Sequence, residues 1–470
     1  MSIRRWLLLG FAAILIALSW FMISAPRRGL VIRQISAGNV PMLYVAPAGV
    51  TAPVPGVVIA HGFAGSKQLM LGYAYTLAHA GYATILFDFN GHGANGAALD
   101  RDALQANIAA ATSTLIAQPE VDRSRLALLG HSMGSGAVMT AGINEAGRYS
   151  AVVAISPTGA AVRPDAPRNL LLQAGSLEGR FAANAGELLA AAGGRGDDFA
   201  GGRARNLVIV PFAEHISILF RRESHAAALD WLGRAFGAAR STSYVDRRIL
   251  WYGLHLAGWL LVLVACAPVL RSHRPVEKPA HVGRRWLGLL LGTLAATAVA
   301  GLLGRFTPLS TLLGIQVGAA VAVWFLIAGV VWLWFNRQVH LPTPRDIGLG
   351  VIFLGLLVLA FGVMGQVVWV QWWPIPARAW RWPILALACL PWFLAAGYSQ
   401  WGARAGGRVS WWLGQTVALV AGLYLTLMLA PSLGFLVLLM PLLPLILLVL
   451  AIGATSFDRP WAYAIGSAFF

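Results

Sequence analysis

Charged residues are scarce in this chain of 470 residues. They make up 11% of the sequence, whereas 58% of it is hydrophobic and the mean hydropathy is +0.69. An ordinary soluble domain has about a quarter of its residues charged, so this composition excludes one for the chain as a whole. Most of the apolar excess lies after residue 249, which predicts that the second half of the chain is embedded in a membrane.

Cysteine is scarce as well, and the two cysteines exclude two kinds of site. Cys266 and Cys389 both lie in long apolar runs, so the sequence predicts neither a disulfide framework nor a cysteine metal site. The metal-binding pattern H-E-x-x-H and a phosphate-binding glycine loop are also missing from the sequence. We therefore expect no metal.

Acidic residues are outnumbered, with 18 against 35 basic ones and a net charge of +17. A basic excess of this size can indicate a nucleic-acid partner, but the sequence has no basic cluster interleaved with aromatic residues. Arginines beside apolar runs instead set membrane topology and attract anionic lipid head groups. We expect the lipid bilayer as a partner and no nucleic acid.

Long apolar runs predict where the chain crosses the membrane. Seven lie in the second half, at 249–270, 286–304, 309–335, 347–371, 383–399, 411–430 and 433–454. An eighth run, 6–24, follows Arg4 and Arg5, and its length favours a retained anchor over a cleaved signal peptide. The predicted domains are an N-terminal transmembrane anchor at 1–29, a soluble domain at 30–245 and a seven-helix transmembrane domain at 246–470.

The charges of the short loops predict an orientation. One side receives Arg4, Arg5, Arg271, Arg274, Lys278, Arg284, Arg285, Arg337, Arg345, Arg404, Arg408 and Arg459. The other side receives Arg305, Arg378 and Arg381. Because positive loops face the cytoplasm, we expect the domain at 30–245 outside a bacterial inner or plasma membrane. Basic residues that flank this domain (Arg27, Arg28, Arg33, Arg247 and Arg248) favour the opposite, but charge governs long translocated domains only weakly.

Ionisable groups inside the predicted spans are too few for an ion- or proton-coupled transporter. His255 lies in the first of the seven spans, and Gln316, Gln366 and Gln415 lie in others. We interpret these residues as hydrogen-bonding partners between helices, with a proton relay at His255 as the open alternative. Transport is not the expected function.

The most informative motif is Gly130-His131-Ser132-Met133-Gly134, between the apolar run 125–129 and the helix-like segment 135–146. Glycines on both sides let the backbone turn sharply from a strand into a helix, which projects the Ser132 hydroxyl from the sheet. The motif alone is weak in a chain with 52 glycines, but this context favours Ser132 as a nucleophile. We interpret His131 as a packing residue.

An acid and a histidine follow the serine in chain order. Glu178 comes just after the predicted strand 169–174, and His215 just after the predicted strand 206–210. Parallel strands end at one edge of a sheet, so Ser132, Glu178 and His215 are expected to meet there as nucleophile, orienting acid and base. Three alternatives for the acid lie in nearby loops: Asp165, Asp197 and Asp198.

An earlier strand supplies a candidate oxyanion hole. Val57 to Ala60 is apolar and runs into His61-Gly62-Phe63. We predict that the backbone N–H groups of Phe63 and Met133 bind the oxyanion, with Gly62 allowing a close approach. The Phe63 ring is an alternative lining for the acyl pocket. The next strand, 83–87, runs into the segment 88–93, which we interpret as a structural turn, so His92 is not expected to be catalytic.

These motifs together resemble the α/β-hydrolase superfamily, in its dienelactone-hydrolase-like and serine-aminopeptidase-like branch. The resemblance covers roughly residues 30 to 240 and rests on 61–63, 88–93, 121–134, Glu178 and His215. It implies an α/β fold with a mostly parallel sheet flanked by helices, and hydrolysis of an ester, thioester or amide without metal or cofactor. Glutamate stands at the acid position, where many members carry aspartate.

A lid domain is not expected. Only residues 156–168 separate the predicted strand 151–155 from the next one, which is too short for a helical cap. The site is therefore expected to be open or covered by another part of the protein. The predicted fold is an α/β-hydrolase domain without a large lid, joined to an all-α polytopic transmembrane domain.

The sequence favours a membrane-anchored serine hydrolase acting on an acylated small molecule, lipid or peptide near the membrane surface. Two alternatives stay open. The first is a catalytically inactive receptor or scaffold, and the second is a membrane acyltransferase that passes the acyl group to an alcohol or amine. The sequence does not indicate a protein partner.

Overall fold

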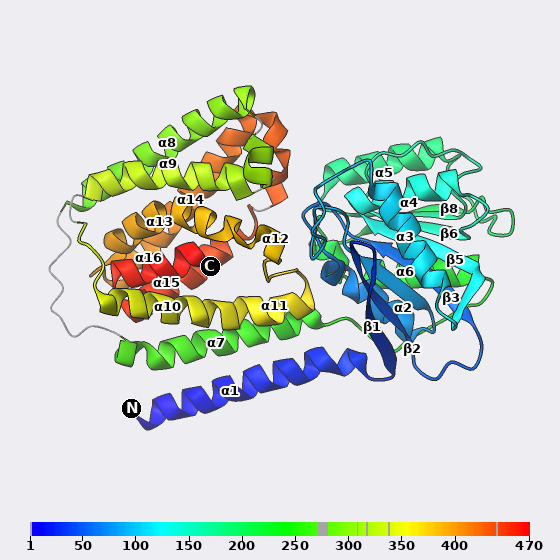
Figure 1. Cartoon of the computed structure of the whole chain (residues 1–470), viewed down its shortest axis with the longest axis horizontal. Coiled ribbons are helices and arrows are strands. Elements are labelled where there is room, and N and C mark those ends of the chain that lie inside the picture. The colour runs from blue at the N-terminus through cyan, green and yellow to red at the C-terminus, as the bar shows by residue number, and fades with distance from the viewer. Residues whose placement is uncertain (1, 271–280, 308, 316–317, 337–338, 439) are drawn as a thin grey trace. The chain divides into compact units, whose positions relative to one another are not determined.

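The computed structural model describes residues 2–270, 281–307, 309–315, 318–336, 339–438 and 440–470. The chain forms two compact units (Figure 1). The α/β unit consists of Leu18–Gly253 and Met364–Ile375, and the helical unit consists of Met1–Ala17, Leu254–Val363 and Pro376–Phe470. The domain boundaries at 30, 245 and 246 stay predictions, but the return of 364–375 to the α/β unit was not expected from the sequence.

The α/β unit is built on one sheet of eight strands. They are β1 (Leu30–Ala37), β2 (Val40–Pro47), β3 (Val54–Ala60), β4 (Ala83–Phe87), β5 (Val121–His131), β6 (Ala151–Ile155), β7 (Leu170–Gly175) and β8 (Arg205–Val210). Their order is β1-β2-β4-β3-β5-β6-β7-β8. The β1–β2 and β2–β4 pairs are antiparallel, and all pairs from β4 to β8 are parallel. The predicted mostly parallel sheet is confirmed.

Helices cover both faces of this sheet (Figure 1). One face packs against α2 (Leu71–His79) and α6 (Arg222–Ala235), and the other against α3 (Leu104–Ile116), α4 (Met133–Asn144) and α5 (Gly179–Ala191). Along β3, Val57 and Ile59 belong to the first core, and Val58 and Ala60 to the second. Strands covered on both faces need continuous apolar runs, which is why the sequence reveals them so clearly.

The remaining helices are long and apolar for the most part. They are α1 (Ile3–Ser24), α7 (Arg248–Leu270), α8 (Val282–Phe306), α9 (Gly318–Asn336), α10 (Pro344–Leu357), α11 (Val363–Val368), α12 (Pro376–Ala379), α13 (Arg381–Gln400), α14 (Ala405–Leu429), α15 (Leu443–Phe457) and α16 (Pro460–Phe469). Short 3-10 helices are η1 (Ala25–Arg27), η2 (Lys67–Met70), η3 (Ser217–Phe220), η4 (Leu309–Gly314) and η6 (Pro431–Leu438), and a π-helical turn, η5 (Val358–Gly362), joins α10 to α11.

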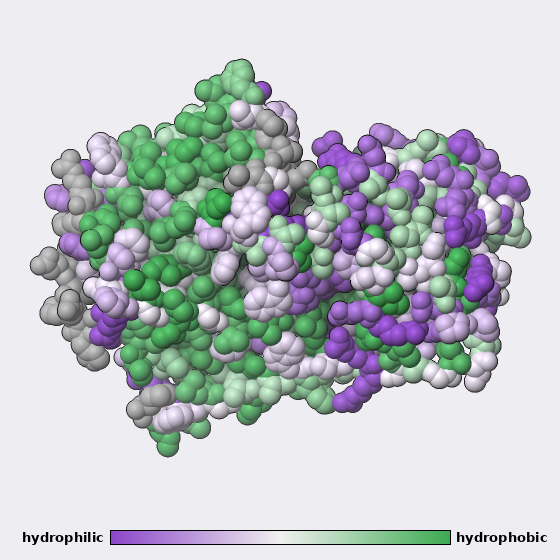
Figure 2. Space-filling model, viewed as in Figure 1, coloured by the Kyte–Doolittle hydropathy of each residue, from purple (hydrophilic) through white to green (hydrophobic). Residues whose placement is uncertain are grey.

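Seven helices within the described residues are long and apolar enough to cross a membrane. They are Ile3–Arg27, Arg248–Leu270, Val282–Phe306, Gly318–Asn336, Pro344–Val368, Pro376–Gln400 and Ala405–Leu429. Large apolar side chains are exposed along them, and the visible face of the helical unit is mostly hydrophobic (Figure 2). Such a surface is costly in water and suits lipid. The helices indicate a multi-pass membrane protein.

The eighth predicted span, 433–454, differs in the structure. Its α-helix begins only at Leu443 and has 15 residues, about 22 Å at 1.5 Å per residue, against about 30 Å for a bilayer core. Pro441 and Pro444 explain the late start, because proline lacks the N–H that a helix interior needs. Two ion pairs still return this segment to the end of the helical unit where α10 and α14 begin: Arg459–Asp346 at 2.6 Å and Arg408–Asp458 at 2.8 Å.

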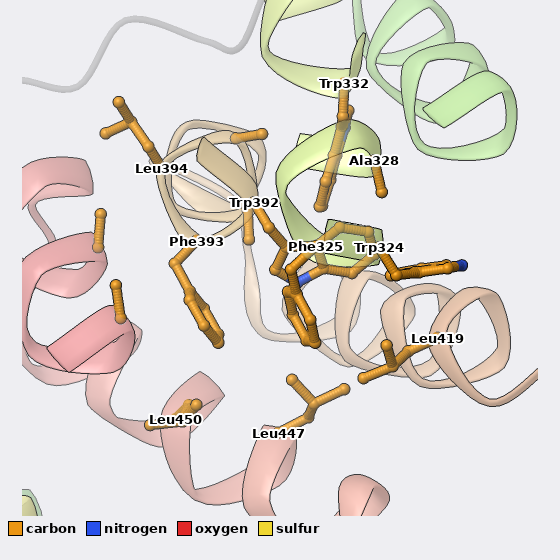
Figure 3. Packing of buried hydrophobic residues seen from close by; sticks show 14 of the residues in the cluster. Trp324, Phe325, Ala328, Trp332, Trp392, Phe393, Leu394, Leu419, Leu447 and Leu450 are labelled. Carbon is orange, nitrogen blue, oxygen red and sulfur yellow. The ribbon is translucent and has the colours of Figure 1, made fainter. Parts of the chain in front are cut away.

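Aromatic side chains form the centre of the helical unit (Figure 3). Trp332 on α9 lies 5.0 Å from Trp392 on α13 between ring centroids, and Trp324 on α9 lies 5.4 Å from Trp392. A Cβ atom on Gly329 would lie 2.2 Å from the backbone nitrogen of Trp392. Small residues at helix contacts allow such close packing in membranes.

The polar residues predicted inside the spans have local partners. His255 Nε2 lies 3.3 Å from the carbonyl oxygen of Leu359, on another helical segment, as predicted. Gln415 instead donates to the carbonyl of Trp411 on its own helix, so the predicted bond between helices is wrong for this residue. Gln316 lies outside the described residues. Arg285 is buried and donates to the carbonyl of Tyr398. The predicted loop cations Arg271, Arg274, Lys278 and Arg337 lie outside the described residues.

Candidate active site

Ser132 lies on a strained turn between β5 and α4. Its backbone has φ 52° and ψ −120°, a conformation that residues other than glycine rarely adopt. A Cβ atom on Gly130 would lie 2.3 Å from the Gly134 carbonyl oxygen, and one on Gly134 would lie 2.5 Å from the His61 carbonyl oxygen. Both glycines of the motif are therefore required by packing, which gives the sequence pattern a physical cause.

The structure brings the three predicted residues together. His215 Nε2 lies 3.1 Å from Ser132 Oγ, and His215 Nδ1 lies 2.9 Å from Glu178 Oε2. Nδ1–H must donate to the carboxylate, so Nε2 is left to accept the proton of the serine hydroxyl. This order of hydrogen bonds can activate a serine for attack on a carbonyl carbon.

The alternative acids lie in other ion pairs. Asp197 pairs with Arg234 at 3.0 Å and Asp198 pairs with Arg203. Asp165 pairs with Arg163 at 3.3 Å. These three carboxylates are at the surface, whereas Glu178 is buried beside His215.

Glu178 is held by a residue that the sequence interpretation missed. Ser156 donates its hydroxyl hydrogen to Glu178 Oε1 over 2.7 Å, and the backbone N–H of Gly175 donates to the same oxygen over 2.5 Å. Ser156 is buried, directly follows β6 and has a φ of 46°. The carboxylate thus has one oxygen fixed by the protein and the other left for His215. The only signal in the sequence was the position of Ser156 at the end of a predicted strand.

The loop after β3, residues 61–68, packs directly against Ser132. Because the sequence predicts that the N–H of Phe63 in this loop binds the oxyanion, we call it the oxyanion loop. A Cβ atom on Gly62 would lie 3.0 Å from the Ser132 Cβ atom and 2.9 Å from His131 Nδ1. His61 donates from Nδ1 to the Gly62 carbonyl over 2.7 Å and accepts the N–H of Phe89 at Nε2. Burial lowers the pKa of His61 to about 4, so this ring is neutral at pH 7 and serves as a scaffold.

Comparisons with known proteins point to one family. A family model described as serine aminopeptidase, S33, matches residues 51–187, within the α/β unit. This match and the eight-stranded, mostly parallel sheet decide the classification. The chain carries an α/β-hydrolase domain. The match confirms the predicted resemblance to the α/β-hydrolase superfamily in its serine aminopeptidase branch.

Individual relatives share only part of the hydrolase domain or little sequence. An uncharacterised protein from Mycobacterium tuberculosis is 33% identical over 81 residues, which are 17% of this chain and 29% of that protein. The chain thus spans less than a third of the length of the curated relatives that it matches. The structure of a dienelactone hydrolase from Anabaena variabilis is 22% identical, with a TM-score of 0.32 over 42% of this chain and 92% of that one. Epoxide hydrolase A from Mycobacterium thermoresistibile is 15% identical, with a TM-score of 0.34 over 43% and 98%.

His131 supports the histidine of the site and does not face the serine as a base. Its Nε2–H donates to the backbone carbonyl of His215 over 2.9 Å. Burial, and then the nearby His215, lower the pKa of His131 well below its ordinary value, so His131 is neutral. Phe181 stacks on the ring of His215, with 4.2 Å between the ring centroids. His215 is therefore fixed through its backbone and its ring.

The turn after β4 anchors the oxyanion loop of the hydrolase domain. Asp88 is fully buried and accepts hydrogen bonds from Lys67 N at 2.7 Å, Lys67 Nζ at 2.5 Å and Ala94 N at 2.9 Å. The His92 ring packs edge-on against Phe63 at 5.4 Å between centroids. These contacts give the turn a structural role, as the sequence indicated.

The hydrolase domain has no helical cap between β6 and β7. The described residues 156–168 contain no helix, in agreement with the short spacing in the sequence.

Gly62→Ala is expected to damage the site without unfolding the domain. The added methyl would push the oxyanion loop away from Ser132, and a displacement of about 1 Å can lower a rate by about 100-fold. We expect kcat on a p-nitrophenyl ester to fall by about that factor. The matched control is Gly186→Ala on α5, where a Cβ atom meets nothing within 4 Å. Equal activity of the two variants would contradict the close packing of the loop.

Proposed function

We propose that the hydrolase domain is a serine hydrolase that cleaves an ester, thioester or amide through an acyl-enzyme. The observation that carries the proposal is the unbroken line of hydrogen bonds from Ser132 through His215 to Glu178. Each member is positioned by a different strand end, and a chance surface cluster would not need the strained backbone at Ser132. This line supports catalysis over a purely structural role for the fold.

The proposed reaction has two halves. His215 takes the hydroxyl proton as Ser132 Oγ attacks the carbonyl carbon, and the backbone N–H groups of Phe63 and Met133 stabilise the oxyanion. Glu178 keeps the imidazole in the correct tautomer and stabilises the imidazolium. The leaving group departs with the proton from His215, and water activated by the same histidine then releases the acid.

Exposed apolar side chains on the loops that carry Glu178 and His215 support a substrate with an apolar acyl group. Leu177 is 65% exposed beside Glu178, and Phe212 is 81% exposed on the loop that leads to His215. The two loops are tied together, because Leu177 N donates to the carbonyl of Ala213 over 2.9 Å. Exposed apolar side chains at the mouth of a site favour apolar ligands. We propose an acylated lipid, small molecule or peptide near the membrane surface.

A fluorophosphonate probe tests the proposed chemistry. The probe labels only an activated serine, so we expect labelling of the detergent-solubilised wild type and none of Ser132→Ala or His215→Ala. The variants must keep the melting temperature of the wild type. A folded wild type that takes up no label would contradict the proposal and favour an inactive receptor or scaffold.

We also propose that the hydrolase domain lies outside the cytoplasm. The described cations near the ends of the spans support this proposal. Arg4, Arg5, Arg284, Arg285, Arg345, Arg404, Arg408 and Arg459 are assigned to one side, and Arg305, Arg378 and Arg381 to the other. Protease added to sealed spheroplasts should therefore digest the domain. Digestion only after the membrane is permeabilised would reverse the orientation.

A further inference from the structure

A short segment from the helical half of the sequence completes the hydrolase domain. Residues Met364–Ile375, which we call the return segment, belong to the same compact unit as Leu18–Gly253. In the sequence the segment connects the spans Pro344–Val368 and Pro376–Gln400. Its Trp369 packs against the core on the α2 and α6 side of the sheet. The hydrolase domain is therefore not a continuous piece of chain.

Gln371 of the return segment bonds to the oxyanion loop twice. Its backbone N–H donates to Ser66 Oγ over 3.1 Å, and its Oε1 accepts from Gln68 Nε2 over 3.1 Å. Ser66 and Gln68 are both buried. These bonds join residues about 300 positions apart, so they fix the loop against a separate part of the chain and not against its own neighbours.

The return segment is itself rigid at Gln371. Gln366 donates to Gln371 Oε1 over 2.9 Å and accepts the N–H groups of Trp372 and Trp373 at its own Oε1. Gln371 Nε2 donates to the carbonyl of Trp373 over 3.0 Å. The acceptor that Gln68 meets is therefore held in one place before the contact forms, which reduces the entropy cost of the bond.

Arg248 also links the return segment to the oxyanion loop, through hydrogen bonds to both. The side chain is buried, and Nη1 donates to the carbonyl oxygens of Gln68 at 3.4 Å and Val368 at 2.5 Å. Its Nε and Nη2 bind the two carboxylate oxygens of Asp246, each at 2.9 Å. A paired, fully hydrogen-bonded guanidinium is costly to displace from the interior. The contact between the return segment and the oxyanion loop is thus supported on more than one side.

Ser66, which bonds to Gln371, lies close in the oxyanion loop to Phe63, the proposed oxyanion donor. Only two residues separate Phe63 from Ser66, and the turn between them is closed by the N–H of Gly65 on the carbonyl of Gly62 at 3.0 Å. Ala64 adopts a positive φ of 57° within this turn. A loop this tight has little freedom to absorb a shift at Ser66, so the shift reaches the backbone N–H of Phe63.

We propose that Gln371 is a positioning residue that holds the oxyanion loop, so that catalysis by the hydrolase domain depends on the return segment. This inference rests on the proposed function, because it assigns Phe63 N–H to the oxyanion. Gln371 touches neither the reacting atoms nor the substrate. It acts through Gln68 and Ser66, and its loss lowers the stabilisation of the transition state more than the binding of the substrate.

The test uses isosteric substitutions in the full-length protein. Gln371→Met and Gln68→Met keep the volume of the side chain and remove the hydrogen bond between them. We expect each to lower kcat on a p-nitrophenyl ester by about 10-fold, with KM within about twofold, since removal of a whole oxyanion donor costs about 100- to 1,000-fold. The double variant should be no slower than Gln371→Met alone, because the bond that Gln68→Met removes is already absent there. Gln371→Met also removes the side-chain bonds of Gln371 to Gln366 and Trp373.

Three controls distinguish a failure of the role proposed for Gln371 from a failure of the proposed hydrolase function. Gln415→Met removes a buried glutamine whose amide bonds only within α14, and it should leave kcat unchanged. If Gln371→Met does not fold, Gln68→Met tests the same bond from the other side. An unchanged kcat, or losses that multiply in the double variant, would overturn the role of Gln371 while wild-type labelling still holds. Absence of labelling in the wild type would instead overturn the proposed function.

Discussion

Ser132→Ala should lower kcat by on the order of 10⁵- to 10⁶-fold. The hydroxyl is the only group in the proposed mechanism that forms a covalent bond to the substrate, and alanine cannot replace it. A small residual rate should persist, because the N–H groups of the oxyanion hole still stabilise attack by water. Single-turnover and steady-state hydrolysis of a p-nitrophenyl ester measure this loss.

The same experiment with His215→Ala checks that the two residues act as a unit. His215 Nε2 lies 3.1 Å from Ser132 Oγ, so its loss leaves the serine without a base. We expect a loss similar to that of Ser132→Ala, and no further loss in the double variant. If the two losses multiplied, the serine and the histidine would not belong to one catalytic chain.

Glu178→Gln is the second variant with a large expected effect, about 10⁴-fold on kcat. The hydroxyl of Ser156 and the N–H of Gly175 both donate to Glu178 Oε1, so the amide oxygen of glutamine is required at that position. The amide NH₂ then faces His215 Nδ1 and donates to it. His215 would carry its proton on Nε2, which points at Ser132 and can no longer accept the hydroxyl proton.

The matched control for this variant is Asp197→Asn. Asp197 pairs with Arg234 at the surface, so its loss should leave kcat unchanged. Ser156→Ala adds a finer check, since it removes one of the two donors to Glu178 Oε1 and should weaken the effect of Glu178→Gln on the tautomer. Full activity of Glu178→Gln would remove Glu178 from the mechanism.

The positions of the strands from β3 onward could be predicted from the sequence because most of them are buried on both faces, whereas β1 and β2 were not predicted. The predicted strands 83–87 and 151–155 have the same ends as β4 and β6. Continuous apolar runs that stop at turn residues leave little choice of boundary. Clear strand ends also made Glu178 and His215 easy to identify as candidates. Parallel strands direct their carboxyl ends to one edge of the sheet, so polar residues that follow those ends are expected to lie close together.

Ser156 and Gln371 could not be predicted in the same way. Ser156 donates to Glu178 from a backbone with a positive φ, a conformation that a sequence signals only where the residue is glycine. Gln371 contacts the oxyanion loop across about 300 residues of sequence. The sequence placed Gln371 only at the end of the predicted span 347–371, directly before two tryptophans. Contacts of this kind depend on how separate segments pack, which local patterns do not contain.

Proline limited the prediction of the last membrane span. Apolar residues follow one another almost without interruption through 433–454, so length and composition alone predict a helix there. Pro441 and Pro444 delay its start, because each lacks a backbone donor. The ion pairs of Asp458 and Arg459 then show that the broken segment still returns to the starting ends of α14 and α10.

The discontinuous hydrolase domain sets an order of events during synthesis. After Gly253 is added to the growing chain, more than a hundred further residues must be added before Gln371 exists, which takes about 6 to 24 s at roughly 5–20 residues per second. The spans that end at Leu270, Phe306, Asn336 and Val368 are all made in this interval. Ser132 and His215 are therefore complete on the nascent chain well before the loop beside them is secured. On the proposed function, the newly made protein gains full activity only once most of its membrane helices have been translated.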